Sequence, residues 1–325
     1  MTAPSLVVLT PVRNEAWILE RFLAVTSRFA DAIIVADQRS TDASREICRR
    51  FPKVTLIDNP DREYNERSRQ QRLIAAARGQ VPGAKILLAL DADEILAADS
   101  LASPAWADVR RALPGTALYF EKPDLLSPPN RHRPSTPFPL GYSDDGRSHD
   151  GLFIHSTRIP TGGSIPRLDV PEIRFLHLAM TRTQEFYARQ RLYSALENVK
   201  RTKSAFQRLA YYSPQIIQRR LDAVARPTPS SWWQGWQDQG IDLFDSPTAP
   251  DNHFNRELLG LFEQYGERRF YWDDVWEFDW ESLRVKILTT DATAAVPRRP
   301  LQLPGKFRHS VLALLRRARW LMMTR

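Results

Sequence analysis

The chain has 325 residues, a formal net charge of +8 and a single cysteine. Its length allows a large hydrophobic core and suggests two domains, or one α/β domain with an elaborate second part. The basic balance favours anionic partners such as a nucleotide, a nucleic acid or an anionic lipid. The lone cysteine excludes an intramolecular disulfide and a cysteine-based zinc site. Because the N-terminus shows no charged and apolar leader and no run is apolar enough to span a membrane, we expect a cytoplasmic protein.

Strand and helix patterns alternate from the N-terminus to residue 94. The expected strands are 6–10, 32–36, 54–57 and 86–90, and the expected helices are 15–29, 40–50 and 64–78, the last with Gly79 as its C-cap. This alternation with short connections is typical of a mostly parallel sheet that is flanked by helices. We therefore expect an α/β fold in this part of the chain.

The pattern becomes less regular after residue 94. The expected elements are a helix at 106–113, strands at 117–121, 152–159 and 173–178, and a mostly helical, Arg-rich segment at 182–225 with a break at Pro214. Five prolines in 127–141 predict a long loop or a lid without regular structure. A tryptophan-rich tail follows residue 231.

The most informative stretch is the fourth expected strand and the acids that follow it. Five apolar residues at 86–90 predict a buried strand, and Asp91, Asp93 and Glu94 come directly after it. Side chains alternate along an extended chain, so both aspartates can point to the same side. Ligands bind beside the carboxyl ends of the strands in open α/β sheets, and two carboxylates there suit Mg²⁺ or Mn²⁺. The alternative is that these acids cap the next helix.

Four segments carry a resemblance to a known family: Thr10–Glu15, Val35–Asp42, Ala77–Gly79 and Leu90–Glu94. In this order they resemble the successive signatures of glycosyltransferase family 2, firmly over residues 5–100 and loosely over 115–205. The resemblance implies the GT-A fold, a nucleotide-sugar-binding α/β sheet with an Asp-x-Asp metal motif. One difference is the sequence Asp37-Gln38-Arg39-Ser40, where the family usually has Asp-Asp-Gly-Ser or Asp-Ser-Gly-Ser.

The resemblance also implies a domain organisation. Residues 1–115 would form the nucleotide-sugar-binding part and 116–205 the acceptor side of the same GT-A domain. Residues 206–325 would form a helical, tryptophan-rich extension that ends in a basic helix.

The same resemblance implies roles for individual residues. The nucleotide-sugar-binding residues would be Pro11, Arg13, Glu15, Asp37, Arg69, Arg72 and Asp91, and the ligands of Mn²⁺ or Mg²⁺ would be Asp91, Asp93 and His177. Each has a plainer alternative, because aspartates form turns, arginines cover solvated helix faces and a lone histidine in an apolar run is often a core residue.

Inverting sugar transfer also requires a carboxylate that takes the proton of the acceptor hydroxyl. We expect Asp145 to be this base, with Glu94 as the competing candidate because it adjoins the metal motif. Asp144 and Asp150 are weaker candidates, and turn formation is the alternative for all three aspartates after the proline-rich stretch.

Together these features predict a metal-dependent inverting glycosyltransferase. It would use a nucleoside-diphosphate sugar, with a UDP-sugar favoured, and a glycan or lipid-linked acceptor, in surface polysaccharide or lipopolysaccharide assembly. The main alternative is a degenerate, non-catalytic scaffold at the membrane. A phosphatase of the haloacid dehalogenase type would carry its Asp-x-Asp after the first strand, and no zinc-finger spacing or aromatic-basic motif supports nucleic-acid binding. No phosphate-binding P-loop or dinucleotide fingerprint is present.

The last segment, 306–325, has six basic residues and no acidic one. Its apolar residues recur at helical spacing, which predicts a helix. That helix would either lie on an anionic membrane at the inner face or pack on the body of the protein with its arginines in solvent.

Overall fold

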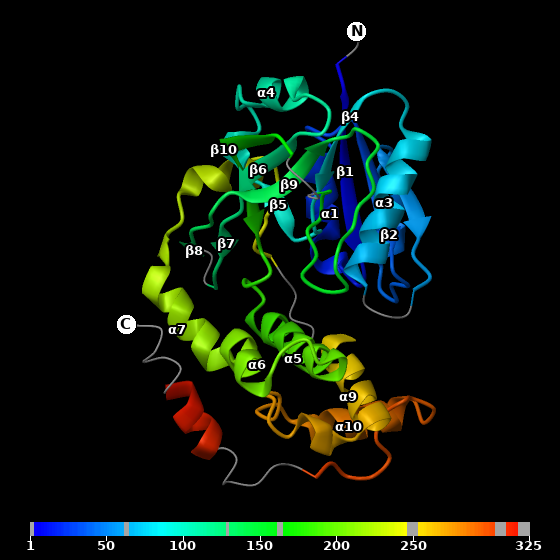
Figure 1. Cartoon of the computed structure of the whole chain (residues 1–325), viewed down its shortest axis with the longest axis vertical. Coiled ribbons are helices and arrows are strands. Elements are labelled where there is room, and N and C mark those ends of the chain that lie inside the picture. Colours follow the sequence, from blue (N-terminus) through cyan, green and yellow to red (C-terminus); the bar gives the residue numbers. More distant parts are fainter. Residues whose placement is uncertain are drawn as a thin grey trace. The chain divides into compact units, whose positions relative to one another are not determined.

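The computed structural model describes residues 3–61, 65–127, 130–160, 165–245, 253–302 and 310–317. These residues belong to two compact units (Figure 1). The α/β unit comprises 1–181 and 226–247, and the helical unit comprises 182–225 and 248–325. The division lies at Thr181, before the predicted boundary at 205, and 226–247 belongs to the α/β unit although it was predicted to be part of the helical extension.

Four parallel strands form the N-terminal half of the sheet: β1 (Ser5–Val12), β2 (Ala32–Asp37), β3 (Val54–Asp58) and β4 (Lys85–Ala89). They lie in the order β4-β1-β2-β3. The helices between them are α1 (Ala16–Thr26), α2 (Ser44–Arg49) and α3 (Glu66–Gln80). The predicted alternation is confirmed, and all four strands end at one edge, called here the carboxyl edge.

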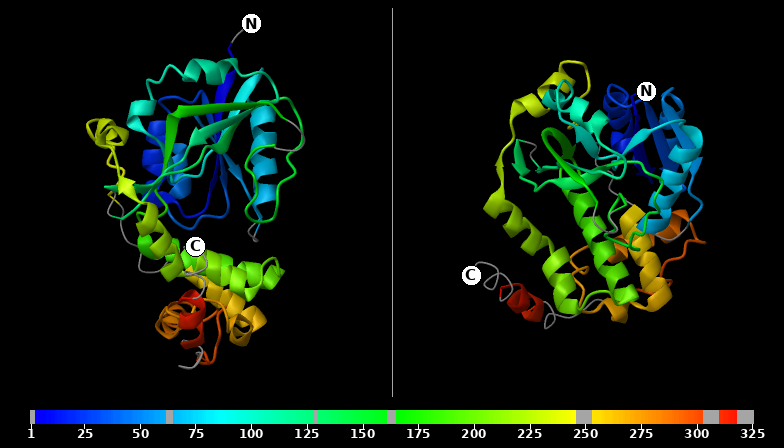
Figure 2. Two further views of the ribbon diagram at one scale, coloured as in Figure 1. Left: turned by 60° about the vertical axis from the view of Figure 1, so that its left-hand side comes forward. Right: turned by 45° about the horizontal axis from the view of Figure 1, so that its top comes forward.

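Helices cover both faces of these strands, which explains why the strands are apolar throughout rather than alternating. Ile18 and Phe22 of α1 share a buried cluster with Val8 of β1. Leu73 of α3 instead packs with Leu9, on the other face of β1. Figures 1 and 2 show α1 and α3 on opposite sides of the blue strands. Gly79, predicted to be the C-cap of α3, lies within the helix, whose C-cap is Val81.

The sheet continues beyond β4 with mixed strand directions. Its further strands are β5 (Glu94–Leu96), β6 (Ala117–Glu121), β7 (Asp124–Leu125), β8 (Arg131–Arg133), β9 (Phe138–Ser143), β10 (Arg167–His177) and β11 (Arg226–Pro227). β9 lies antiparallel between β4 and β6, β10 runs parallel to β6, and β5 pairs with the end of β10. The predicted fold class, a mostly parallel sheet flanked by helices, is thus confirmed.

The prediction of a loop over 127–141 was wrong for its described part, because this part contains β8 and most of β9. Pro139 is tolerated in β9 because the register with β6 shifts between Leu118 and Tyr119, next to the Tyr119–Pro139 pair. The prediction of a strand at 152–159 was also wrong. These residues belong to an irregular stretch, 144–160, that lies along α3 through hydrogen bonds such as Glu66 N to Phe153 O (2.9 Å).

The remaining elements of the α/β unit are short. They are η1 (Ala98–Ser100), α4 (Trp106–Arg111), η2 (Ser230–Trp232) and α8 (Gln234–Gln237). Trp236 of α8 is fully buried and donates its indole N–H to the carbonyl of Leu96 at 2.7 Å. This anchor explains why 226–247 belongs to the α/β unit.

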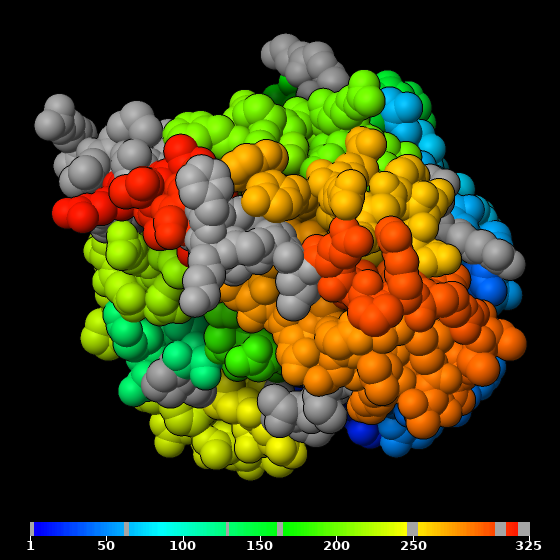
Figure 3. Space-filling model, turned by 90° about the horizontal axis from the view of Figure 1, so that it is seen from below, coloured from blue at the N-terminus to red at the C-terminus, as the bar shows by residue number. Residues whose placement is uncertain are grey.

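The helical unit is built from α5 (Thr183–Lys200), α6 (Ala205–Tyr212), α7 (Pro214–Val224), α9 (His253–Tyr265), η3 (Glu267–Phe270) and α10 (Trp280–Thr290). Pro214 begins α7, a position that tolerates proline, so the predicted break is confirmed. The core is aromatic, with the ring of Phe262 stacked on Trp276 at 5.1 Å. Figure 3 shows the surface formed by α9 and α10 (yellow to orange). No helix of the described ranges is long and apolar enough to cross a membrane.

Candidate functional site

The loops after β1 and β2 are tied together at the carboxyl edge. Asn14 N donates to Ser40 Oγ at 2.9 Å, and Thr41 N donates back to Asn14 Oδ1 at 2.7 Å. Asn14 and Arg39 both have left-handed backbones, with φ of 57° and 56°. Such conformations cost energy in residues other than glycine and concentrate at functional sites. The two loops therefore form one braced platform.

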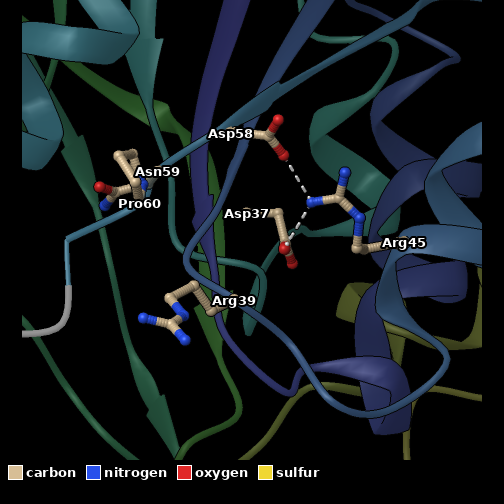
Figure 4. Close-up of a pocket in the computed structure, with 6 residues that line it drawn as sticks. All are labelled: Asp37, Arg39, Arg45, Asp58, Asn59 and Pro60. Atoms are coloured by element: carbon tan, nitrogen blue, oxygen red, sulfur yellow. Dashed lines mark hydrogen bonds and ion pairs between the residues drawn. The ribbon is translucent and has the colours of Figure 1, made fainter.

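A cavity of about 300 Å³ opens beside this platform (Figure 4). Its lining residues are Asp37, Arg39, Arg45, Asp58, Asn59 and Pro60. Figure 4 shows Arg45 between the two aspartates, where it donates to Asp37 Oδ2 at 2.9 Å and to Asp58 Oδ1 at 2.8 Å. Asp37 Oδ1 is buried and has no hydrogen-bond partner among the described residues. Because buried polar atoms are normally paired, this oxygen is available to a donor group of a ligand.

The other residues predicted to bind the nucleotide are close in sequence to the strand ends and loops of this region. Pro11 and Arg13 lie at and just after the end of β1, where Pro11 pairs with Ala36 of β2. Glu15 accepts the indole N–H of Trp17 at 2.7 Å. Arg69 lies near the start of α3, which follows β3.

Arg72, one turn further along α3, makes a loose ion pair of 3.8 Å with Asp61. All of these predicted residues therefore follow strands that end at the carboxyl edge.

The acids after β4 form a buried charge network. Asp91 Oδ2 is 2.6 Å from Arg158 NH2. Glu94 is fully buried and contacts Arg158 NH1 at 2.5 Å and Lys122 Nζ at 2.9 Å through its two oxygens. Burial alone would raise the pKa of Glu94, but the charges of Arg158 and Lys122 outweigh it and lower that pKa far below its ordinary value.

Both Glu94 oxygens are occupied by cations, and one of them also accepts the backbone N–H of Asp91 at 3.0 Å. A carboxylate in this state is a poor proton acceptor. The arrangement argues against the predicted role of Glu94 as a base and indicates that it anchors the acidic turn.

Asp93 lies on the other side of this turn, next to His177. The antiparallel pairing of β5 with β10 sets His177 opposite Glu94, and Leu178 N donates to Asp93 O at 2.8 Å. His177 Nδ1 lies 2.5 Å from Asp124 Oδ1, and Nε2 lies 3.7 Å from Asp93 Oδ2. Burial opposes ionisation of Asp124, but the bond and charge of His177 prevail and lower the pKa of Asp124 to about 2.

This geometry suits a metal-binding histidine. A ligating imidazole usually donates its second N–H to a carboxylate, which fixes its tautomer and orientation. Here Asp124 accepts a hydrogen bond from Nδ1–H, and Nε2 lies on the side of Asp93. No group of three or more His, Cys, Asp or Glu side chains of the described ranges is arranged around a metal position. An ion held by Asp93 and His177 would therefore need water and substrate phosphates as its other ligands.

Asp145, the predicted base, does not lie near these residues. In the register of the antiparallel pair, Ser143 at the end of β9 faces Ile86 at the start of β4. Asp145 thus follows β9 at the edge opposite the carboxyl edge, where Arg147 pairs with it at 2.7 Å. The stretch before Asp145 was predicted to be a loop, so the position of Asp145 after an antiparallel strand did not follow from the sequence.

Three residues around the acidic turn were not predicted, namely Lys122, Asp124 and Arg158, and neither were Arg45 and Asp58 of the cavity. Asp124 and Lys122 follow the expected strand at 117–121, so the same strand-end rule could have found them. Arg158 lies in an irregular stretch and carries no local signal.

Residues 7–107 match the model of glycosyl transferase family 2, which confirms the resemblance predicted from the sequence. No curated protein matches the sequence.

Several solved structures are similar at low identity. Glucosyl-3-phosphoglycerate synthase from Mycobacterium tuberculosis, in complex with Mn²⁺, uridine diphosphate and glucosyl-3-phosphoglycerate, shares 18% identity over 37% of this chain, with a TM-score of 0.28. The alignment spans 44% of that enzyme, less than half of its length. TarS 1–349 of S. aureus shares 12% identity over 82% of each chain, with a TM-score of 0.38. At these TM-scores, the donor and acceptor of this chain do not follow from the similarity.

Proposed function

We propose that this chain transfers a sugar from a nucleoside-diphosphate sugar to an acceptor hydroxyl with inversion, in the presence of Mn²⁺ or Mg²⁺. The observation that carries the proposal is the unpaired, buried Oδ1 of Asp37 at a cavity on the carboxyl edge. The Asp93–His177 pair lies at the same edge, after β4. A nucleoside site and a cation site along one edge are what a nucleoside-diphosphate sugar requires.

The residues divide the work between them. Asp37 Oδ1 would accept an N–H or O–H of the nucleoside, and the braced loops would keep it in position. Asp93 and His177 would hold the metal, which neutralises the charge of the departing diphosphate when it is bound. Asp124 holds the imidazole ring in the orientation that directs Nε2 to Asp93.

The finer parts of the proposal concern substrates and pathway. A UDP-sugar is the favoured donor, and a glycan or lipid-linked hydroxyl is the acceptor. The reaction would belong to surface polysaccharide or lipopolysaccharide assembly on the cytoplasmic side. These parts rest on the family resemblance of the sequence.

Thermal-shift measurements test the nucleotide site. A panel of UDP, GDP, dTDP, CDP and ADP is compared with and without Mn²⁺. At about 100 times its dissociation constant, the cognate nucleotide should stabilise the protein by about 2.7 kcal/mol and raise the melting temperature by about 5 °C or more. In Asp37→Ala, measured against its own unliganded melting temperature, we expect most of this rise to disappear because the nucleoside loses its acceptor.

Asp169→Asn is the matched control, because Asp169 is an exposed partner of Arg167 on β10. It should keep the full rise. If no nucleoside diphosphate stabilises the wild type with Mn²⁺, the proposal fails.

The contacts of residues 310–317, the described part of 306–325, favour packing on the protein over attachment to a membrane. Leu312 is 2% exposed, and Arg316 pairs with Asp274 and Glu277 of the helical unit. These contacts favour the packed-helix alternative. We expect deletion of 306–325 to leave co-sedimentation with phosphatidylglycerol vesicles unchanged. Sedimentation of the full chain but not of the deletion variant would instead establish the membrane role.

A further inference from the structure

We propose that Arg158 binds the diphosphate of the donor and that Asp91 and Glu94 hold its guanidinium in place before the donor arrives. The inference rests on the proposed function, because it assigns a residue to the diphosphate of the same donor. Arg158 lies in the irregular stretch 144–160 and reaches the carboxyl end of β4 from there.

The guanidinium of Arg158 is held by hydrogen bonds, but these do not use all of its N–H donors in the described part of the chain. NH2 donates to Asp91 Oδ2 at 2.6 Å, and NH1 donates to Glu94 Oε2 at 2.5 Å and to the carbonyl of Ala89 at 3.4 Å. A guanidinium has five N–H donors. In the described part of the chain these contacts use three of them, so Nε and one proton of NH2 remain for a ligand. The side chain is 20% exposed, which leaves it accessible to an anion at this edge.

The stretch that carries Arg158 is fixed along α3. Arg67 Nε donates to Gly151 O at 2.5 Å, and Gln71 Nε2 donates to His149 O at 2.7 Å. At Gly151, a Cβ would lie 2.0 Å from Ser156 Oγ, so this close approach requires glycine. These hydrogen bonds and this close approach hold the stretch against α3 and so fix the position of Arg158.

The chemistry of the side chain suits phosphate. An arginine fork can donate two parallel hydrogen bonds to phosphate oxygens, and its charge stays fixed. The charges of Asp91 and Glu94 outweigh the cost of burial and raise the pKa of Arg158, so it remains cationic. Lys122 Nζ donates to the second oxygen of Glu94, its side chain is 14% exposed, and its ammonium lacks the planar fork of an arginine. Arg158 is thus the more exposed cation of this network and the one that can donate to two phosphate oxygens at once.

This assignment also separates the roles of the two aspartates. Asp91 is engaged by Arg158, whereas Asp93 faces His177. Asp91 then acts as a positioning residue for the guanidinium, and the metal pair reduces to Asp93 and His177.

The alternative is that Arg158 only neutralises the charges of Asp91 and Glu94. Measurements of nucleotide binding distinguish this structural role from diphosphate binding. Isothermal titration calorimetry in the presence of Mn²⁺ compares the affinities for UDP and UMP. If the wild type prefers another base, the diphosphate and monophosphate of that base are compared in the same way. In Arg158→Ala we expect the affinity for the diphosphate to fall about tenfold or more, about 1.4 kcal/mol, while the monophosphate binds as before. Arg158→Lys keeps the charge and loses the fork, so its loss should be smaller but in the same direction.

Arg110→Lys is the matched control, because Arg110 forms an exposed ion pair of 2.9 Å with Asp31 at the opposite end of β1. It should bind both nucleotides as the wild type does. If Arg158→Ala is unstable, Arg158→Lys alone decides the question. An unchanged ratio of diphosphate to monophosphate affinity in the Arg158 variants overturns this inference alone. If the wild type binds no nucleoside diphosphate, the proposed function itself is overturned.

Discussion

Replacement of Asp93 by alanine is expected to lower kcat/KM for sugar transfer about 1,000-fold, which corresponds to about 4 kcal/mol of transition-state stabilisation. Asp93 is 6% exposed, and its carboxylate faces the Nε2 of His177. Its loss removes one of the two protein ligands that the proposed metal site offers. The expected measurement is steady-state transfer from the donor whose nucleotide the thermal-shift panel identifies, together with Mn²⁺ binding followed by electron paramagnetic resonance.

The contact of Asp93 with Leu178 is kept in this variant, because it uses the backbone carbonyl. Asp99→Ala is a suitable control. Asp99 lies six residues further along in η1, and its side chain is 33% exposed with Arg174 as a loose partner at 3.8 Å. This variant should retain the activity and the Mn²⁺ affinity of the wild type. An Asp93→Ala protein that keeps more than about a tenth of the activity with undiminished Mn²⁺ binding would refute the assigned role.

The parallel half of the sheet could be predicted because burial on both faces leaves a local signal. Strands such as 85–89 are apolar at every inner position, and each ends in turn-forming residues, so their limits follow from the sequence alone. The mixed half depends instead on partners that are distant in sequence. β9 is stabilised by β4 and β6, and nothing within its proline-containing sequence indicates that it pairs with either.

The difference between local signals and contacts with distant segments also explains which site residues could be predicted. Asp37, Asp93 and His177 each lie at or just after the end of a strand, so a rule about strand ends brings them to the carboxyl edge. Asp145 follows β9, which was predicted to be a loop and runs antiparallel to β4, so its place at the opposite edge depends on a pairing that the sequence does not indicate. Arg158 lies in no regular element, and its importance comes only from the two carboxylates that it reaches.

The buried network around Glu94 should also be a large contributor to stability. Glu94→Gln keeps the shape of the side chain but removes its charge, which leaves Lys122 without its anion and Arg158 with Asp91 alone. Breaking a buried ion pair by removing one partner typically costs about 3 to 5 kcal/mol. We expect a loss of this size in the free energy of unfolding of the α/β unit, measured by urea denaturation at neutral pH.

Two further variants test whether the loss of stability comes from unpaired charge or would follow any substitution in this region. Glu121→Gln removes a carboxylate that is 35% exposed and pairs with Arg174 at 2.9 Å, so it should cost less than about 1 kcal/mol. Adding Lys122→Met to Glu94→Gln removes one of the stranded cations and should restore part of the lost stability, since the penalty comes from unpaired charge rather than from lost volume. If Glu94→Gln costs no more than Glu121→Gln, Glu94 does not anchor the acidic turn.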